Sequence, residues 1–532
     1  MTPVPFKFVE GTIDQLHTSI KTGGISCHDV VKGYLDRIAA YDKQGPALNA
    51  VITVSDTALA EADKLDAYYK TNKKLIGPMH CVTVLPKDNI DSFDMPTSAG
   101  SAAMINAQPD TDAYILKKIR DAGGIIIGKA NLDEFAFGFQ GWGTHPRGGQ
   151  VKNAYDLERG PGGSSSGTGA SIAASFAMVG IGTDTGGSVR VPSSVEGLVG
   201  IRPSLRLVSQ DGIIPLAPFQ DTAGPMCRTV QDCAVLLDSM VGYDSSSAAN
   251  QRASFEKDAA PVANATAYQA MTGVPTSYTQ YLNKDGLKGA RIGVVRALFG
   301  TETGASDDEK AIVNKAVNDA INQLKAAGAT VDDVTIDDLN TILTDYRSVS
   351  AFEFKTSLTT YLQSWSNAKD QHYLSYDEVL ASAKARPNFN AYNTDLTDPA
   401  TQASYVKNTV ERPVYTRLRI GSALDNTTLS GVSKGTRYDV LLYPTIQGLP
   451  SVLGGSPNTG TNNRLSPFTG FPAMNIPAGM VQVSDTTPKL PVGMEMIARQ
   501  FDEPTLIKIG YAWQEYAKPR VAPTYTPELA AK

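Results

Sequence analysis

Apolar residues recur at helical and strand spacing from the start of the chain. Between Ser26 and Tyr41 they fall three or four positions apart, which predicts a packing helix, and Thr12 can cap a shorter helix before it. Residues 49–54 have the composition of a strand, and a charged helix is predicted over about 56–72. The N-terminal region is therefore predicted to contain three helices and one strand.

The alternation of helix and strand continues along the chain. A helix is predicted over 111–122, where Gly123 and Gly124 end it before the apolar strand 125–127. The same order returns as a strand, a helix and a strand over 290–295, about 307–327 and 329–336. Strands that repeatedly follow helices favour an α/β fold with a largely buried sheet.

Composition narrows the class of protein. The 532 residues are 42% hydrophobic and 19% charged, enough to bury a sizeable core. The net charge of −6 comes without any concentrated run of Lys or Arg, so we expect no nucleic-acid partner and no anionic membrane partner. No apolar segment reaches the roughly 18 residues of a membrane span, and the N-terminus lacks a signal-peptide pattern. We expect a cytoplasmic protein, with an export signal removed ahead of residue 1 as the alternative.

Cysteines and histidines show little pattern. The four cysteines are too scattered for a disulfide framework, so we expect small buried thiols, with a Cys227–Cys233 pair as the alternative. The five histidines have no metal-ligand spacing, and no metal site is predicted.

Two glycine-rich loops carry the strongest chemical signal. Ser164 follows one Gly-Gly pair, and Ser188, 24 positions later, follows another. Glycines allow backbone N–H groups to converge without a Cβ clash. Lys87 ends the apolar stretch 82–85, and a buried lysine can lose its proton near neutral pH and serve as the base that a serine nucleophile requires. This combination indicates Ser-Lys acyl transfer, although an ordinary lysine there would extend to solvent.

These motifs resemble those of the amidase signature hydrolases, and the resemblance covers most of the chain. The matching stretches are 77–78, 87–90, 128–136 (GKANLDEFA), 161–203 and 221–225, with weaker matches at 439–444, 470–479 and 490–493. Trp142-Gly143, Arg147 to Gln150 and Asn153 resemble the peptide-amidase branch. Pro86 departs from the family, which usually has an apolar residue with a free N–H there, so the strand pairing at this point is open.

The resemblance implies an α/β fold with a large mixed β-sheet covered by helices on both faces, in a single domain over residues 1–532. It implies that Ser188 is the nucleophile and that Ser164, after a cis peptide bond, relays a proton between Ser188 and Lys87. The N–H groups of Thr185, Gly186, Gly187 and Ser188 are the expected oxyanion hole. Asp184 and Arg190 resemble a pair that braces this loop. The plain alternatives are a helix N-cap for Ser164 and a solvated ion pair for Asp184 and Arg190.

Substrate contacts are less well defined by the sequence. Aromatic and polar residues just before the first serine loop are expected to contact the substrate, although aromatic residues so spaced are usually core: Phe137, Gly138, Phe139, Gln140 and Trp142. Residues 243–288 are predicted to form a surface excursion, and about 340–435 a variable specificity region. Peptide amides, anilides, fatty amides and carbamates all remain candidate substrates.

Other functional readings are weaker. Residues 163–167 fit the G-x-S-x-G pattern, which would make Ser165 the nucleophile of an α/β-hydrolase, but only His372 follows it in the chain. The glycine-rich loop also does not fit a phosphate-binding loop, because it lacks the lysine that this motif requires. We therefore predict an amidase that needs no cofactor and acts on a small-molecule amide as a monomer or homodimer. The alternatives are the amidase subunit of a glutamine-dependent amidotransferase, a carbamate- or ester-cleaving relative, and a non-enzymatic binding protein.

Overall fold

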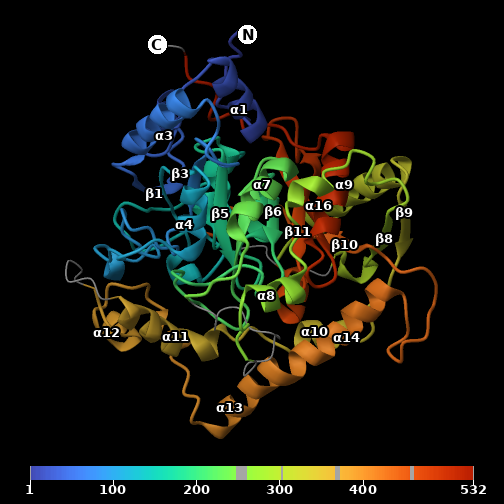
Figure 1. Cartoon of the computed structure of the whole chain (residues 1–532). Helices are drawn as coiled ribbons and strands as arrows, with labels where there is room; N and C mark the ends of the chain where they lie inside the picture. Colours follow the sequence, from blue (N-terminus) through green and yellow to red (C-terminus); the bar gives the residue numbers. More distant parts are fainter. Residues whose placement is uncertain (1, 247–259, 301–303, 366–371, 456–459, 531–532) are drawn as a thin grey trace.

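The chain folds around one large mixed sheet. The computed structural model describes residues 2–246, 260–300, 304–365, 372–455 and 460–530. Its ten-stranded sheet has the order β3-β2-β5-β7-β6-β11-β12-β10-β8-β9, and β1 pairs with β4 in a separate two-stranded sheet (Figure 1). The strands are β1 Val51–Val54, β2 Thr83–Pro86, β3 Ile125–Ile126, β4 Gly128–Ala130, β5 Val179–Asp184, β6 Val199–Arg202, β7 Thr222–Cys227, β8 Arg291–Val294, β9 Thr330–Asp333, β10 Val440–Pro444, β11 Ala473–Val481 and β12 Leu490–Ile497.

Helices surround this sheet and also form a separate layer beneath it in Figure 1, where α11 to α14 lie. The α-helices are α1 Ile13–Thr22, α2 Cys27–Tyr41, α3 Ala58–Asn72, α4 Tyr114–Asp121, α5 Ser166–Ala173, α6 Arg190–Val195, α7 Val230–Met240, α8 Ala265–Thr272, α9 Asp307–Ala326, α10 Leu339–Thr344, α11 Ser350–Ser364, α12 Tyr376–Ala381, α13 Pro399–Val406, α14 Arg412–Asp425, α15 Leu465–Thr469 and α16 Glu503–Ala517.

The side chains of β10 show that both faces of the sheet are covered. Val440 and Leu442 belong to the largest hydrophobic cluster, which also contains residues of α9 and α16. The intervening Leu441 and Tyr443 belong to a second cluster with residues of α14 and α15. Because successive strand residues point to opposite faces, helices pack on both sides of the sheet. The predicted α/β architecture is confirmed.

Parallel pairing of β2 with β5 brings the two functional segments together. Pro86 is in register with Ile181, and the N–H of Lys87 donates to the Ile181 carbonyl at 2.9 Å. Both strands end at the same edge of the sheet, so the residues that follow them meet there. Strand β3 pairs only with Thr83 and Val84, so the missing N–H of Pro86 costs no ladder hydrogen bond to that neighbour. The pairing left open by Pro86 is thus intact.

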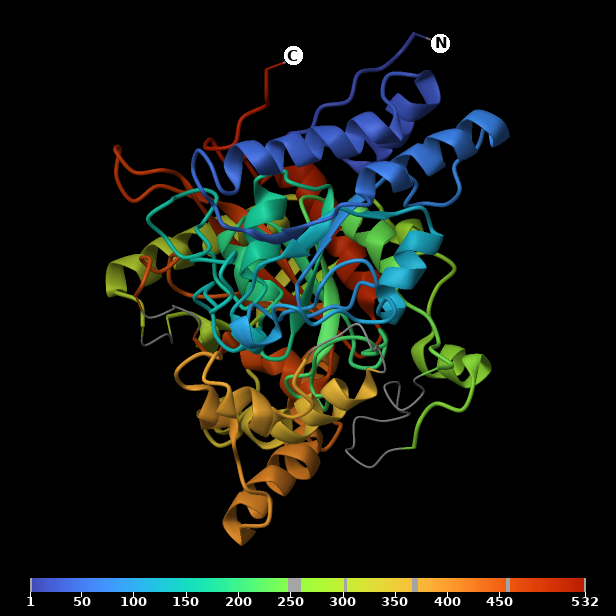
Figure 2. The same cartoon turned by 90° about the vertical axis from the view of Figure 1, so that its left-hand side faces the viewer.

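Local signals located several elements to within a few residues. Thr12 caps α1 in a capping box with Gln15, and Ser26 caps α2. The predicted helix over 307–327 corresponds to α9, whereas the predicted strand over 329–336 is shortened to β9. In Figure 2 the two ends of the chain lie at the same end of the molecule, where Glu528 accepts hydrogen bonds from the N–H groups of Phe8 and Val9.

The middle region was predicted only in outline. The excursion over 243–288 falls partly on residues outside the described ranges; its described part contains α8, whose Tyr268 packs into the main core. The region 340–435 contains five of the helices named above, and its role in specificity stays a prediction. Among the described residues, none of the helices combines the length and apolar composition that crossing a bilayer requires.

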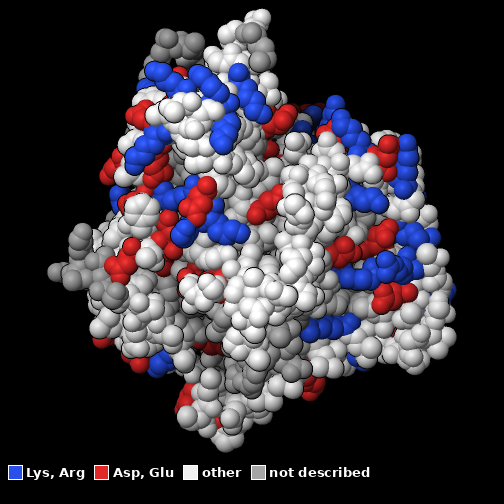
Figure 3. All heavy atoms as spheres, viewed as in Figure 1, with Lys and Arg blue, Asp and Glu red and all other residues white. Residues whose placement is uncertain are grey.

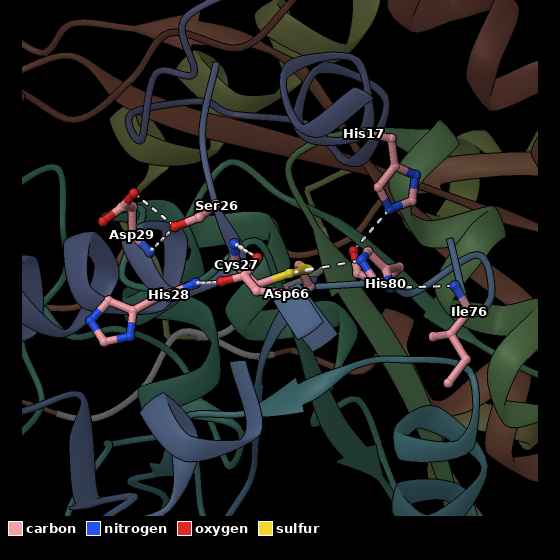
Figure 4. Close-up of a disulfide and its surroundings, with 9 residues drawn as sticks. His17, Ser26, Cys27, His28, Asp29, Asp66, Ile76 and His80 are labelled. Carbon is pink, nitrogen blue, oxygen red and sulfur yellow. Dashed lines mark hydrogen bonds between the residues drawn. A yellow bond between two sulfur atoms is a disulfide. The ribbon is translucent and has the colours of Figure 1, made fainter. Parts of the chain in front are cut away.

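All four cysteines are buried, as predicted, but they are paired and not free thiols. Cys227 pairs with Cys233, the alternative considered from the sequence, and Cys27 pairs with Cys81, which is 54 positions away. The Cα atoms are 5.2 Å apart in the Cys27 pair and 5.6 Å apart in the other, within the usual range for disulfides. Figure 4 shows the Cys27 sulfur directed at His80 Nε2, 3.8 Å away.

Charges are mixed on the face shown in Figure 3. Basic and acidic side chains alternate over the region of α3 and around α9, while the lower centre of this face is mostly uncharged. No single-sign stripe of the kind that nucleic-acid binding uses is visible on this face.

Candidate active site

Lys87 is the buried centre of a polar cluster at the ends of β2 and β5. Its side chain is 0% exposed, and its Nζ lies 2.7 Å from Ser164 Oγ and 2.9 Å from Thr183 Oγ1. Burial lowers the pKa of Lys87 to about 7, against the opposing charges of Asp133, Asp184 and Asp221. A large fraction of Lys87 is therefore neutral at physiological pH, as a base must be. The solvent-exposed alternative for this lysine is excluded by its burial.

Ser164 reaches Lys87 because of the turn that precedes α5. The peptide bond between Gly163 and Ser164 is cis, as the resemblance implied. The N-cap of α5 is Ser165, without a side-chain capping bond, so Ser164 does not cap the helix. A Cβ at Gly163 would lie 2.7 Å from the Cα of Phe139, too close for any other residue. The glycine thus lets the loop pack tightly while Ser164 Oγ turns toward the lysine.

Ser188 follows β5 at the opening of the cluster. Its backbone carbonyl accepts from the N–H of Ser165 at 3.3 Å, which ties the two serine loops together. Its side chain is 5% exposed, and among the described residues its hydroxyl has no hydrogen-bond partner. Of the four amides expected in the oxyanion hole, that of Gly187 instead donates to Asp184 Oδ1 at 2.8 Å. The role of Ser188 as nucleophile stays a prediction, as do the amides of Thr185, Gly186 and Ser188 as donors to an oxyanion.

Asp184 and Arg190 form a buried pair that holds this loop. Arg190 Nε donates to Asp184 Oδ2 at 3.0 Å, and both side chains are 0% exposed. Glu495 and Arg202 extend the pair into a network of two acids and two arginines. Burial alone would raise the pKa of Asp184, but the positive charges of Arg190 and Arg202 hold that pKa below its usual value. The solvated alternative for this ion pair does not apply.

Three residues near Lys87 were not singled out from the sequence. Thr183 Oγ1 also accepts from Asn89 Nδ2 at 3.0 Å, so it links Lys87 to Asn89. The Asp133 carboxylate accepts from the N–H groups of Gln140 and Gly141, and burial raises its pKa to about 6. All three lie in stretches matched to the family. The pairing of β2 with β5 puts Thr183 and Lys87 on adjoining strand ends.

The five residues expected to contact substrate do not line the cavity beside the Lys87 cluster. The ring of Phe137 stacks on Tyr392 and packs against Phe354, so it belongs to a hydrophobic cluster, the core alternative. Phe139 packs near α6, whereas Gly138, Gln140 and Trp142 are exposed. A cavity of about 630 Å³ beside Thr183 and Thr185 has none of these five residues in its wall. Their contact with substrate stays a prediction.

The α/β-hydrolase interpretation finds no triad. The Ser165 hydroxyl is fully buried and donates to the Thr183 carbonyl at 3.2 Å. His372 Nε2 lies 2.8 Å from the Leu362 carbonyl, and its ring packs against Trp365. Each side chain is thus committed to a separate part of the fold.

Within the described ranges, one group of side chains has metal-ligand proximity. The ligand atoms of Cys27, His80 and Cys81 lie within 4.8 Å of one another. The two sulfur atoms are bonded to each other, and a metal ligand must be a thiolate. With the two cysteines joined in a disulfide, His80 is the one member of this group that can bind a metal.

Comparisons with known proteins agree on one family. A family model described as Amidase matches residues 29–507. The crystal structure of a peptide amidase from Stenotrophomonas maltophilia is 30% identical, covers 98% of this chain and 100% of its own, and superposes with a TM-score of 0.81. An amidase family protein from Bacillus anthracis is 29% identical, with 97% and 93% covered and a TM-score of 0.77. A glutamyl-tRNA(Gln) amidotransferase subunit of Methanosarcina acetivorans is 29% identical over 95% of this chain and 96% of its own.

Proposed function

Because the chain belongs to the amidase family, whose members hydrolyse amide C–N bonds, we propose that it does so with Ser188 as the nucleophile and with Ser164 and Lys87 as its proton relay. The observation that supports this most directly is the 2.7 Å separation of Lys87 Nζ and Ser164 Oγ in a buried cluster. A lysine with a pKa near 7 can accept a proton at neutral pH, which an exposed lysine cannot.

The proposed reaction has two halves. Neutral Lys87 accepts the proton of Ser164, which accepts that of Ser188 as the Ser188 Oγ attacks the carbonyl carbon. The N–H groups of Thr185, Gly186 and Ser188 stabilise the oxyanion, while Gly187 holds the loop through Asp184. The relay returns the proton to the leaving amine as the C–N bond breaks. Water then attacks the acyl-Ser188 ester by the same route, and neither half requires a cofactor.

For the substrate, we propose amides of amino acids or peptides. The support is the 30% identity to peptide amidase over nearly the full length of both chains. A second candidate is the release of ammonia from glutamine for a partner protein, favoured by the 29% identity to the glutamyl-tRNA(Gln) amidotransferase subunit. We propose a monomer or homodimer for the first activity, whereas the second requires a partner.

We propose a cytoplasmic location, with export as the alternative because disulfides persist mainly in oxidising compartments. Because both side chains are buried, thiol labelling of Cys27 and Cys227 in denaturant, immediately after cell lysis, tests this. Labelled thiols support the cytoplasm, and blocked ones support export.

One experiment tests the nucleophile and the two activities. The purified chain is treated with a serine-directed acylating probe and mapped by peptide mass spectrometry, and Ser188 is the expected site. In parallel, ammonia release is measured from glutamine and from a panel of amino acid and peptide amides. Labelling at Ser165 would contradict the proposed nucleophile. Turnover of glutamine alone, dependent on an added partner, would favour the amidotransferase activity.

A further inference from the structure

The 630 Å³ cavity begins next to the proposed relay. Asn89, Thr183 and Thr185 form one part of its wall, and Thr183 Oγ1 is the second contact of Lys87 Nζ. Most of the remaining wall comes from residues 210–223 and from α11, with smaller parts from Asp91, residues 109–111, Ala136 and Trp365. A substrate whose carbonyl lies near Ser188 therefore has this cavity as the adjoining space for its remaining groups.

The wall of this cavity is acidic. It contains four aspartates, Asp91, Asp110, Asp211 and Asp221, and no Lys or Arg among its described residues. Asp110 is exposed, Asp211 and Asp221 are half-buried, and Asp91 is 4% exposed, so carboxyl groups extend from the surface to the interior. Acidic walls of low dielectric concentrate negative potential inside a cavity. This potential attracts a cation and repels a carboxylate.

Lys129 is the basic side chain whose charge acts on Asp91. Lys129 is fully buried and is bonded to Asp88, Thr97 Oγ1 and the Pro96 carbonyl. Burial raises the pKa of Asp91 to about 7, and the charge of Lys129 only partly opposes this. A bound cation would favour the ionised form of Asp91, and the negative charge of Asp91 would in turn attract the cation.

Asn89 is a second and independent indication of a ligand. Its side chain is 2% exposed, and its Nδ2 donates to Thr183. Its Oδ1 has no hydrogen-bond partner, although a buried acceptor is normally paired. Asn89 is part of the cavity wall, so the donor we propose for this oxygen is a group bound beside it in the cavity, such as an N–H group of the substrate.

Aromatic rings complete the wall. Tyr361 of α11 and Trp365 lie edge to face, with centroids 5.1 Å apart, and the Tyr361 hydroxyl lies 2.5 Å from Asp91 Oδ1. Ring faces attract organic cations. We propose that this cavity binds a cationic nitrogen of the substrate, so that the enzyme prefers amides with an ammonium group close to the scissile carbonyl. This proposal rests on the proposed function, because it assumes that the cavity adjoins the reacting bond.

Matched substrate pairs test the preference. The full chain is given N-acetyl-lysine amide and N-acetyl-norleucine amide, which differ by the side-chain ammonium, and alanine amide with and without an N-acetyl group, which differ by the α-ammonium. We expect kcat/KM to be at least tenfold higher for the cationic member of one pair at low salt, and this ratio to fall as NaCl is added. The pair that responds identifies which ammonium the cavity binds.

Variants then connect the preference to the cavity. The double variant Asp110→Asn/Asp211→Asn should lower the preference at least fivefold, and Asp110→Lys alone should lower it further. Asp485→Asn, an exposed aspartate outside the cavity wall, should leave it unchanged. A ratio near one in both pairs, or a preference that survives the double variant, would overturn the proposal. Ser188→Ala is measured on all four amides: persistent hydrolysis would contradict the proposed nucleophile, while the ratio would still report on the cavity.

Discussion

The Nζ of Lys87 and the Oγ of Ser164 lie 2.7 Å apart at a place where neither side chain is exposed. The lysine directly follows strand β2, and the turn before α5 carries the serine. Lys87 is thus removed from water, which disfavours its charged form. It is also held against a hydroxyl, which can accept or donate the proton that a relay passes on.

The first prediction concerns pH. Lys87 acts as a base only when it is neutral, and its pKa is lowered to about 7. Hence kcat/KM should rise with pH and level off above an apparent pKa near 7. Lys87→Ala should lower turnover by several orders of magnitude, and Lys87→Arg should do the same because arginine keeps its proton. The measurement is a pH–rate profile from pH 5 to 9. An arginine variant with near-normal activity would show that the base is another group.

The Lys87 cluster shows how much of the site could be predicted from the sequence. Lys87, Ser164 and Ser188 stand in local motifs whose glycines, spacing and family resemblance are visible in the chain itself. Thr183 and Asp133 lie in the same matched stretches, but their contacts with the cluster depend on how the strands pair. Strand pairing between distant segments is not encoded in any local pattern.

The cavity wall was even harder to predict, because it is formed by segments that lie far apart in the sequence. Phe137 packs against Phe354 and Tyr392, more than 200 positions away, and no local pattern predicts these contacts. The cavity wall includes Tyr361 of α11, in a region without diagnostic sequence. Likewise, the sheet order places β11 and β12 between β6 and β10, and this brings Glu495 to Arg190. Each of these contacts comes from tertiary packing.

The second prediction concerns stability. Above about pH 7 the folded chain has lost the Lys87 proton, while the unfolded chain keeps it until about pH 10.5. The unfolded state therefore binds more protons in this window, and the contribution of Lys87 to stability rises with pH. Lys87→Met should stabilise the fold at pH 7 by on the order of 2 kcal/mol.

Thermal unfolding of the two proteins at several pH values checks this. The Tm advantage of Lys87→Met should be largest near pH 7 and shrink toward pH 10. An advantage that grows with pH would contradict the sign of the pKa shift.

The third prediction compares a buried ion pair with an exposed one. Arg190→Met leaves the carboxylates of Asp184 and Glu495 without their main counter-charge inside the protein. Removing one partner of a buried pair costs about 3–5 kcal/mol, and the loop that carries Ser188 loses its brace. The control Arg296→Met breaks the exposed contact with Asp333 and should cost about 1 kcal/mol or less.

Urea unfolding and turnover of a good amide substrate separate the two variants. Arg190→Met should lower both the free energy of unfolding and kcat, whereas Arg296→Met should leave kcat near the parent value. Equal effects of the two substitutions would remove the bracing role from Arg190.

The last prediction uses two neighbouring serines as a matched pair, Ser164 in the turn before α5 and Ser166 at the start of α5. Ser164 Oγ contacts Lys87, whereas Ser166 Oγ is buried with no hydrogen-bond partner. Each substitution by alanine removes one buried hydroxyl, and neither removes a helix-capping bond, because the N-cap of α5 is Ser165. Stability should therefore change little in Ser164→Ala and rise slightly in Ser166→Ala, where an unpaired polar group is lost.

Turnover should differ sharply between the two variants. Ser164→Ala interrupts the proton path between Lys87 and Ser188 and should lower kcat by at least a hundredfold in both acylation and deacylation. Ser166→Ala should keep kcat within about twofold, because its hydroxyl bonds to no group of the cluster. The measurement is single-turnover acylation followed by ester hydrolysis, with Tm as the check on folding. If Ser164→Ala folds normally and turns over at nearly the parental rate, Lys87 must deprotonate Ser188 directly or through water, and Ser164 has no place in the relay.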